Sequence, residues 1–238
     1  MLGSMNLIAA IGIGLGSMLS HAESPGAHQT PVTAIDILLE PDATMLRHAE
    51  ASNARLLKVY PKGFALDEEH RPHITLLQRF VRTADLDRVY VAAEKVLADA
   101  KVTRLRLEAF KNYYTPGGDV GVAGISIRRT PALDALQGKL IAAVSPFTVE
   151  TGPIDAFAAS HADPAHDALL IGYVATFVPK QTGEHFDPHG STGVAPKGYL
   201  DRMLTEPFTP FTFSPAGAAV YQLGPFGTAA KKLKEWHE

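Results

Sequence analysis

The stretch PHITL at residues 72–76 decides the fold of this chain, and it leads into the apolar run TLLQRFV at residues 75–81. The β-favouring composition of that run predicts a strand that begins near His73. Alternate side chains of a strand share a face, so His73 and Thr75 are expected to point the same way. An imidazole that exchanges a proton near neutral pH therefore stands beside a hydroxyl that can donate to an anion.

The chain contains the same arrangement a second time, in PHGST at residues 188–192. His189 and Ser191 again share a face of a predicted strand, and a proline again precedes the histidine. The histidines lie 116 positions apart (189 − 73), one in each half of the chain. A single His-x-Thr triplet arises easily by chance, whereas the pair of them points to chemistry.

This pair resembles the repeated His-x-Thr/Ser motif of the 2H phosphoesterase superfamily, which includes RNA 2',5'-ligase-like proteins and 2',3'-cyclic phosphodiesterases. Three further stretches resemble the periplasmic branch of that superfamily: GEHFDPH at 183–189, VYQLG at 220–224 and FGTA at 226–229. The resemblance covers nearly all of the chain after residue 30. It implies two similar lobes related by a pseudo-twofold axis, with the two motif strands facing a shared cleft.

The strands and helices expected along the chain also favour an α+β fold. The resemblance implies that its sheets are largely antiparallel, with outer helices around a central cleft. Strands are expected at 34–39, 103–110, 120–127, 208–213 and 218–223, besides the two motif strands. Helices are expected after Pro41, from near Thr83, after Thr130, from Asp163 and at 199–204, and residues 169–177 are apolar enough to be buried. Residues 228–236 fit a helix or a strand equally well.

Two imidazoles on opposite sides of a phosphate suit its displacement by water, because the attacking and leaving oxygens lie in line. One imidazole takes a proton from water, and the other gives one to the leaving oxygen. We therefore expect His73 and His189 to be catalytic, with Thr75 and Ser191 donating to the phosphoryl oxygens. The implied reaction is metal-independent hydrolysis of 2',3'-cyclic phosphate ends of RNA or of small cyclic nucleotides, without a cofactor.

Three other residues are candidates for substrate binding. Arg79 has the same strand parity as His73 and is expected to reach the phosphate; the alternative is a solvated arginine at a strand end. Tyr113 and Tyr114 precede a glycine-rich turn and can stack on a base; the alternative is packing in the core or at its rim.

Two other functions stay open. Gly190 and Thr192 stand where the family pattern has apolar residues, and a glycine loosens a strand, so a non-catalytic protein that binds a nucleotide or phosphate is one alternative. A metal-dependent hydrolase is the other, and it ranks lower because the spacing of its ligands matches no known motif. Its candidate ligands are His161, His166, His185, Asp187 and His189.

The amino-acid composition limits the binding partners that this protein is expected to have. The 238 residues are 46% hydrophobic and 20% charged, with a net charge of −3 and no basic tract, which argues against tight binding to long nucleic acid. A small nucleotide or a short RNA end bearing a phosphodiester remains the expected partner, bound by a monomer. The absence of cysteine excludes disulfides, thiol catalysis and cysteine-bound zinc.

The N-terminus has the features of an export signal. Residues 1–22 carry no Lys, Arg, Asp or Glu, and an apolar run at 7–19 is followed by small residues at Ser20 and Ala22. We expect cleavage after Ala22, a flexible linker at 23–31 and a single bilobal domain at 32–238. The mature protein is then periplasmic or secreted and has no membrane segment.

Overall fold

The computed structural model describes residues 30–68, 70–158, 164–224 and 227–237, and the side chains of 164–166 are not described. The expected signal peptide and all but the end of the expected linker lie outside these residues. In the described part, no helix has both the length and the apolar character needed to cross a membrane.

Both halves of the chain mix strands and helices, as the sequence predicts. The strands are β1 (Val32–Pro41), β2 (Ile74–Arg82), β3 (Leu107–Gly117), β4 (Val120–Ile127), β5 (Thr148–Val149), β6 (His189–Pro196), β7 (Phe211–Phe213), β8 (Pro215–Leu223) and β9 (Ala229–Trp236). The α-helices are α1 (Ala43–Val59), α2 (Leu86–Ala100), α3 (Pro131–Val144), α4 (Pro164–Ala175), α5 (Phe177–Gln181) and α6 (Lys197–Met203).

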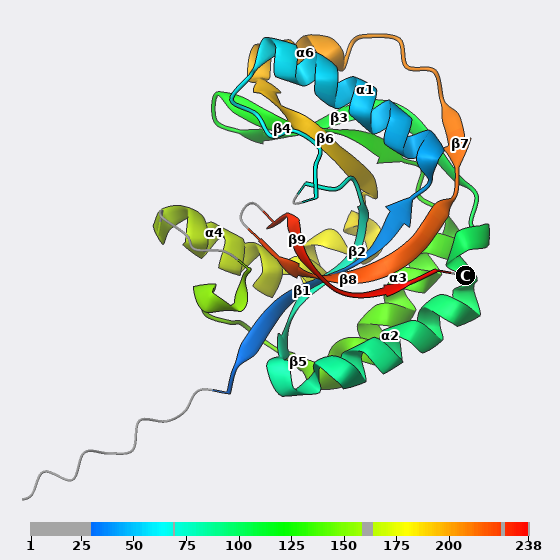
Figure 1. Cartoon of the computed structure of the whole chain (residues 1–238), viewed down its shortest axis with the longest axis vertical. Coiled ribbons are helices and arrows are strands. Elements are labelled where there is room, and N and C mark those ends of the chain that lie inside the picture. The colour runs from blue at the N-terminus through cyan, green and yellow to red at the C-terminus, as the bar shows by residue number, and fades with distance from the viewer. Residues whose placement is uncertain (1–29, 69, 159–163, 225–226, 238) are drawn as a thin grey trace, which may run out of the picture.

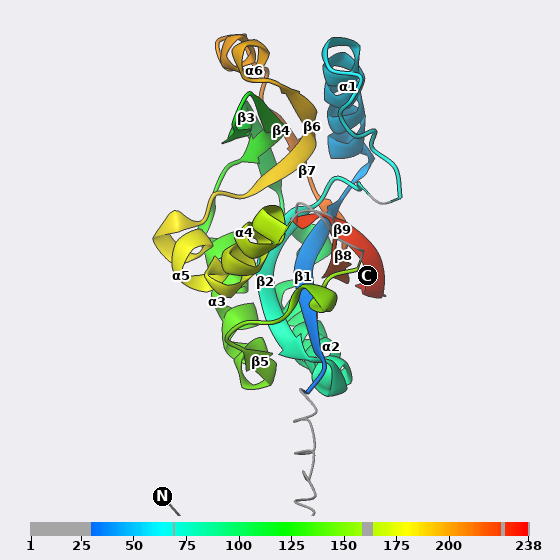
Figure 2. The same cartoon turned by 90° about the vertical axis from the view of Figure 1, so that its left-hand side faces the viewer.

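The strands form two sheets, with the orders β5-β2-β1-β8-β9 and β6-β4-β3-β7. Every described pairing in them is antiparallel, which confirms the predicted α+β class. In Figure 1 the four-stranded sheet lies in the upper half with α1 and α6, and the five-stranded sheet lies in the lower half with α2 and α3. The turned view in Figure 2 shows the same division. Each motif strand therefore belongs to a different sheet.

The main core lies between the five-stranded sheet and its helices and continues into the four-stranded sheet, through Leu107, Ala109, Ile125, Ile127 and Phe213. Ile35, Ile37 and Leu39 alternate along β1 and are fully buried on one face. The apolar stripes of α2 and α3 belong to the same cluster, and they include Val89, Ala93, Leu97, Leu133, Leu136 and Leu140. This packing anchors the first motif strand, because β2 pairs with β1 along its whole length.

Local signals in the sequence set two helix starts correctly. The side chain of Asp42 accepts hydrogen bonds from the backbone N–H groups of Thr44 and Met45, at 2.9 and 3.1 Å, and so caps α1. Thr130 caps α3 in the same way by accepting from the N–H of Leu133 at 3.2 Å, with a proline at the first helical position.

Three expectations about the elements need correction or completion. Residues 169–177 are not buried all round, because α4 packs only one side against the sheet, through Leu170 and Val174, and leaves 73% of Leu169 exposed. The strand expected at 103–110 begins only at Leu107, after a short 3-10 turn. Residues 228–236, which fitted a helix or a strand, contain β9.

Candidate functional site

The two motif histidines are held in the same way. The Nδ1 atom of His73 lies 2.7 Å from the carbonyl oxygen of Arg71, and Nδ1 of His189 lies 2.8 Å from that of Asp187. A carbonyl can only accept, so each Nδ1 carries the hydrogen of its bond. Each imidazole is left with Nε2 as the atom that exchanges a proton, and both rings are fixed from behind by the backbone two residues earlier.

Both motif strands also carry a β-bulge at the same place. In β2, Leu77 pairs with Ile37 and Thr75 with Leu38, so Leu76 is an extra residue without a partner. In β6 the extra residue is Thr192, because Gly193 and Ser191 pair with consecutive residues of β4. Each bulge follows the hydroxyl-bearing residue directly, so the two motifs share a backbone as well as a sequence pattern.

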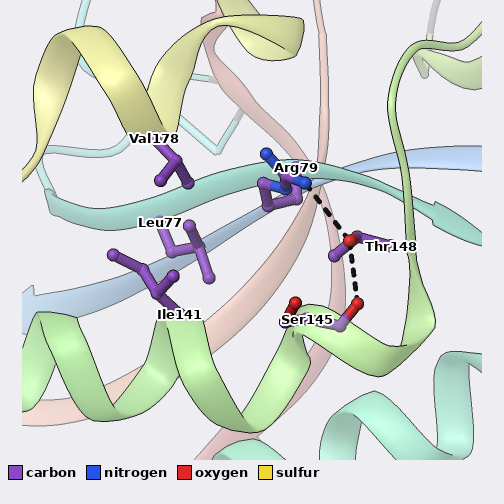
Figure 3. A pocket seen from close by; sticks show the side chains of 6 residues that line it. All are labelled: Leu77, Arg79, Ile141, Ser145, Thr148 and Val178. Atoms are coloured by element: carbon purple, nitrogen blue, oxygen red, sulfur yellow. Dashed lines mark hydrogen bonds between the residues drawn. The ribbon is translucent and has the colours of Figure 1, made fainter.

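The bulge overturns the expectation for Arg79. An extra residue shifts the alternation of side chains along the strand, so Arg79 lies on the face opposite to Thr75. It lines a small cavity of about 120 Å³ together with Leu77, Ile141, Ser145, Thr148 and Val178 (Figure 3). There its guanidinium donates to the Thr148 hydroxyl at 3.2 Å, away from the motif residues of its own strand.

Because of the bulge, Gln78 lies on the face of β2 that carries Thr75, where the sequence pattern had predicted Arg79. Thr75 Oγ1 and Gln78 Nε2 both donate to the same oxygen of Asp36, Oδ2, at 2.8 and 3.0 Å. Asp36 lies on β1, is fully buried and has its Oδ2 3.7 Å from Nε2 of His73. Its other oxygen, Oδ1, has no hydrogen-bond partner among the described residues. Sequence reasoning missed Asp36, although a lone acid inside the apolar run at 34–39 was a signal for it.

The two motif hydroxyls differ in their contacts. The single hydroxyl proton of Thr75 is engaged by Asp36, so the expectation that it is free to donate to a phosphate does not fit this geometry. The hydroxyl of Ser191 has no hydrogen-bond partner among the described residues, so its proton is available. Only the second motif therefore presents the free donor that both were expected to present.

The tyrosines at 113 and 114 separate, because neighbouring residues of a strand point to opposite faces. The ring of Tyr113 lies beside that of His189, with centroids 4.8 Å apart and planes tilted by 41°. Tyr114 points the other way, where its hydroxyl donates to Asp201 on α6 and its ring packs against the cluster of Leu200 and its neighbours. Tyr113 stays a candidate for stacking on a base, and the contacts of Tyr114 match the stated alternative of packing at the rim of the core.

Two titratable groups, His189 and Tyr173, have pKa values that are shifted chiefly by burial. Burial lowers the pKa of His189 below its ordinary value, and the charge on His73 lowers it further, against the opposing effect of Asp187. Burial also raises the pKa of Tyr173, on α4, to about 12, with contributions from Asp36 and Tyr113. The shared cleft that the family resemblance implies stays a prediction.

Gly190 lies where the two motifs approach each other. A Cβ atom added to it would come 2.9 Å from Cε of Met45 on α1 and 3.6 Å from the backbone oxygen of His73. Real Cβ contacts are essentially never shorter than 3.0 Å. The glycine that departs from the family pattern is thus accommodated by a methionine that fills the space of the missing side chain.

Metal-binding groups in the described residues lie elsewhere. Glu40, Glu235 and His237 bring ligand atoms within 4.8 Å of one another, but the ammonium of Lys232 already lies 2.8 Å from Glu40 and 2.5 Å from Glu235. Of the ligands expected near the second motif, His161 lies outside the described residues and the side chain of His166 is not described. That metal site stays a prediction.

No family model matches the chain, and no curated protein matches it. Solved structures do match. TT0787 of Thermus thermophilus is 17% identical, with a TM-score of 0.46, over 86% of this chain and 97% of its own. E. coli LigT complexed with 3'-AMP is 13% identical, with a TM-score of 0.40, over 87% of this chain and 98% of its own. The MHV ns2 PDE domain is 8% identical, with a TM-score of 0.43, over 85% of this chain and 99% of its own. A further matched structure is described as a phosphoesterase and is 11% identical to this chain, with a TM-score of 0.40.

Proposed function

We propose that this chain is a metal-independent phosphoesterase that hydrolyses 2',3'-cyclic phosphates, on RNA ends or on small nucleotides. One observation carries the proposal. Both motif histidines have Nδ1 fixed on a backbone carbonyl and Nε2 left for proton exchange, and each is followed by a hydroxyl residue and a bulge at the same positions. Chance resemblance of two triplets does not account for a shared backbone.

The chemistry follows from the two rings. A neutral imidazole accepts at Nε2 and takes a proton from water as the water oxygen bonds to phosphorus. A charged imidazole donates from Nε2 to the leaving ribose oxygen as its bond to phosphorus breaks. Each role is typically worth about 10²- to 10⁴-fold in rate. Neither step needs a group that the chain does not supply.

The hydroxyl of Ser191 supports the proposal as a donor to a non-bridging oxygen, where negative charge grows in the transition state. The ring of Tyr113, which already lies against His189, offers a face on which a base can stack. Together they account for a nucleotide substrate in preference to inorganic phosphate or a small phosphate ester.

A second function, non-catalytic binding of a nucleotide or phosphate on the same scaffold, is favoured by one observation. Thr75 donates to Asp36, so the first motif does not present the free hydroxyl that was expected to bind the phosphoryl group. Such a protein would bind nucleotides without turning them over.

Hydrolysis of 2',3'-cyclic AMP by the purified protein in EDTA tests the proposal. We expect turnover that EDTA leaves unchanged and that a His189→Ala variant loses by about 10²-fold or more. A Tyr114→Phe variant serves as the control, because that side chain lies on the far face of β3. Nucleotide binding without turnover would replace the enzyme with the binding protein, and loss of turnover in EDTA would replace it with a metal-dependent hydrolase.

A further inference from the structure

Arg79 is a half-buried arginine with no carboxylate to balance its charge. Among the arginines of the described residues, only Arg79 and Arg82 are not exposed, and both lie on β2. Arg82 pairs with Asp85 and also donates to the backbone oxygens of Pro146 and Thr148. No carboxylate of the described residues lies within pairing distance of Arg79, and burial lowers the pKa of its guanidinium. An unbalanced charge that is partly removed from water is costly, and an anion beside it would offset the cost.

Most hydrogen-bond donors of Arg79 are unused, and the side chain lines a cavity of about 120 Å³. Its Nη2 atom donates to the hydroxyl of Thr148 at 3.2 Å, and its other N–H groups have no partner among the described residues. The Thr148 hydroxyl gives its own proton to the backbone oxygen of Ser145 at 2.9 Å, so towards the cavity it can only accept. The side-chain hydroxyl of Ser145 also lines the cavity and has no partner in the described part of the chain. The cavity therefore offers a guanidinium and a hydroxyl as donors, and its lining residues include no acid.

The rest of the cavity wall is aliphatic. Figure 3 shows the polar side chains on one side and, on the other, the aliphatic side chains of Leu77, Ile141 and Val178. These three residues come from β2, α3 and α5 and belong to the main core or pack against it. The cavity is somewhat smaller than one of about 150 Å³ that binds benzene, so it suits a ligand of about four to six non-hydrogen atoms.

We propose that this cavity binds the carboxylate of a short aliphatic acid, of about two to four carbons. The planar guanidinium fits a carboxylate as a fork, through two parallel hydrogen bonds, and the Ser145 hydroxyl donates to the same group. One negative charge balances the charge of Arg79, whereas a dianion such as sulfate leaves an excess charge beside apolar side chains. The alkyl chain of the acid is removed from water against Leu77, Ile141 and Val178.

The proposed acid site is separate from the two motifs. Arg79 and Leu77 lie on the face of β2 that packs against the main core, and the bulge places Thr75 on the opposite face. Binding of an acid here therefore does not depend on the phosphoesterase function proposed above, and each of the two can fail without the other.

An NMR titration of the purified protein with sodium butyrate tests the site, at an ionic strength held constant with sodium chloride. We expect saturable binding to the wild type that is weaker by about tenfold or more in Arg79→Gln, because hydrogen bonds between charged groups are lost. Butyramide has the shape of butyrate without its charge, and it should bind about tenfold or more weakly, as should sodium sulfate. Arg128→Gln is the matched control, because that exposed arginine is already paired with Glu108, and it should bind butyrate as the wild type does. Equal affinity of wild type and Arg79→Gln, or equal affinity for butyrate and butyramide, would overturn the proposal.

The same titration locates the ligand. Butyrate should shift the methyl signals of Leu77, Ile141 and Val178 with one common binding constant, and it should leave the methyl signal of Met45, which lies beside Gly190, unchanged. Val178→Phe puts a larger side chain into the cavity and keeps the guanidinium, so it should weaken butyrate binding by about tenfold or more. The wild-type shifts need no variant, so they test the location even where a substitution unfolds the chain. Shifts centred on Met45, full affinity in a folded Val178→Phe protein, or no saturable binding at millimolar butyrate would contradict the proposed site.

Discussion

Gly190 offers the sharpest test of how the two motifs are held together. A valine at this position would restore the β-branched residue of the family pattern, and its Cβ would lie 2.9 Å from Cε of Met45 and 3.6 Å from the backbone oxygen of His73. The two γ-carbons of valine need more room still. We therefore expect Gly190→Val to move both neighbours and to weaken the site as well as the fold.

The expected destabilisation by Gly190→Val follows from the packing around residue 190. Adding carbons to a filled core typically costs about 1–3 kcal/mol, and the end of the flexible Met45 side chain can yield part of the way, which argues for about 2 kcal/mol. In a chain of this size, that lowers the melting temperature by about 4–8 °C. Thermal unfolding followed by circular dichroism measures the shift, and kcat on a cyclic nucleotide should fall because the backbone at His73 is displaced.

Controls separate this clash from the general effect of the substitution. Gly138→Val, at an exposed helical glycine with no atom within 4 Å of a new Cβ, should change stability by less than about 0.5 kcal/mol. Met45→Ala removes the obstructing side chain. The double variant Gly190→Val with Met45→Ala should therefore lose less free energy of unfolding than the two single variants lose together, by about 0.5–3 kcal/mol. Additive effects, or a Gly190→Val protein as stable and active as the wild type, would refute the packing account.

Three other predictions concern single features. Ser191→Ala should cost about 1.5–3 kcal/mol of transition-state stabilisation in kcat/KM, the range for a hydrogen bond to a charged group, and a full rate would make that hydroxyl structural. Arg79→Gln should leave kcat/KM within about twofold of wild type, since its side chain lies on the other face of β2, and a loss of about tenfold or more would return Arg79 to the site. N-terminal sequencing of the exported protein should begin at Glu23, and a retained Met1 would contradict cleavage after Ala22.

Local patterns in the sequence predicted much of the fold. Asp42 and Thr130 predict where their helices begin, because a capping side chain bonds only to the backbone N–H groups of the next turn. The strand at His73 and the hairpin partner at 120–127 follow from composition and alternation, which also depend on near neighbours alone. The pairing of distant strands, such as β1 with β8, carries no comparable local signal.

The candidate site was predicted less completely, and one residue explains most of the shortfall. Parity counted through Leu76 placed Arg79 beside His73, but the bulge at Leu76 reverses parity beyond it and brings Gln78 to that face instead. Bulges form through pairing with another strand, so TLLQRFV alone does not reveal one. Asp36 was missed for a related reason, since its contact with Thr75 joins two strands 39 residues apart.

The double substitution His73→Ala with His189→Ala tests the central claim most directly. If the two rings are the acid and base of one displacement, each single variant loses about 10²-fold or more in turnover of a 2',3'-cyclic nucleotide. The double variant should then be only slightly slower than either single variant, because residues that act as a unit are not additive. Near-normal turnover by His189→Ala, or a double variant slower by the product of the two single effects, would contradict a shared two-histidine mechanism.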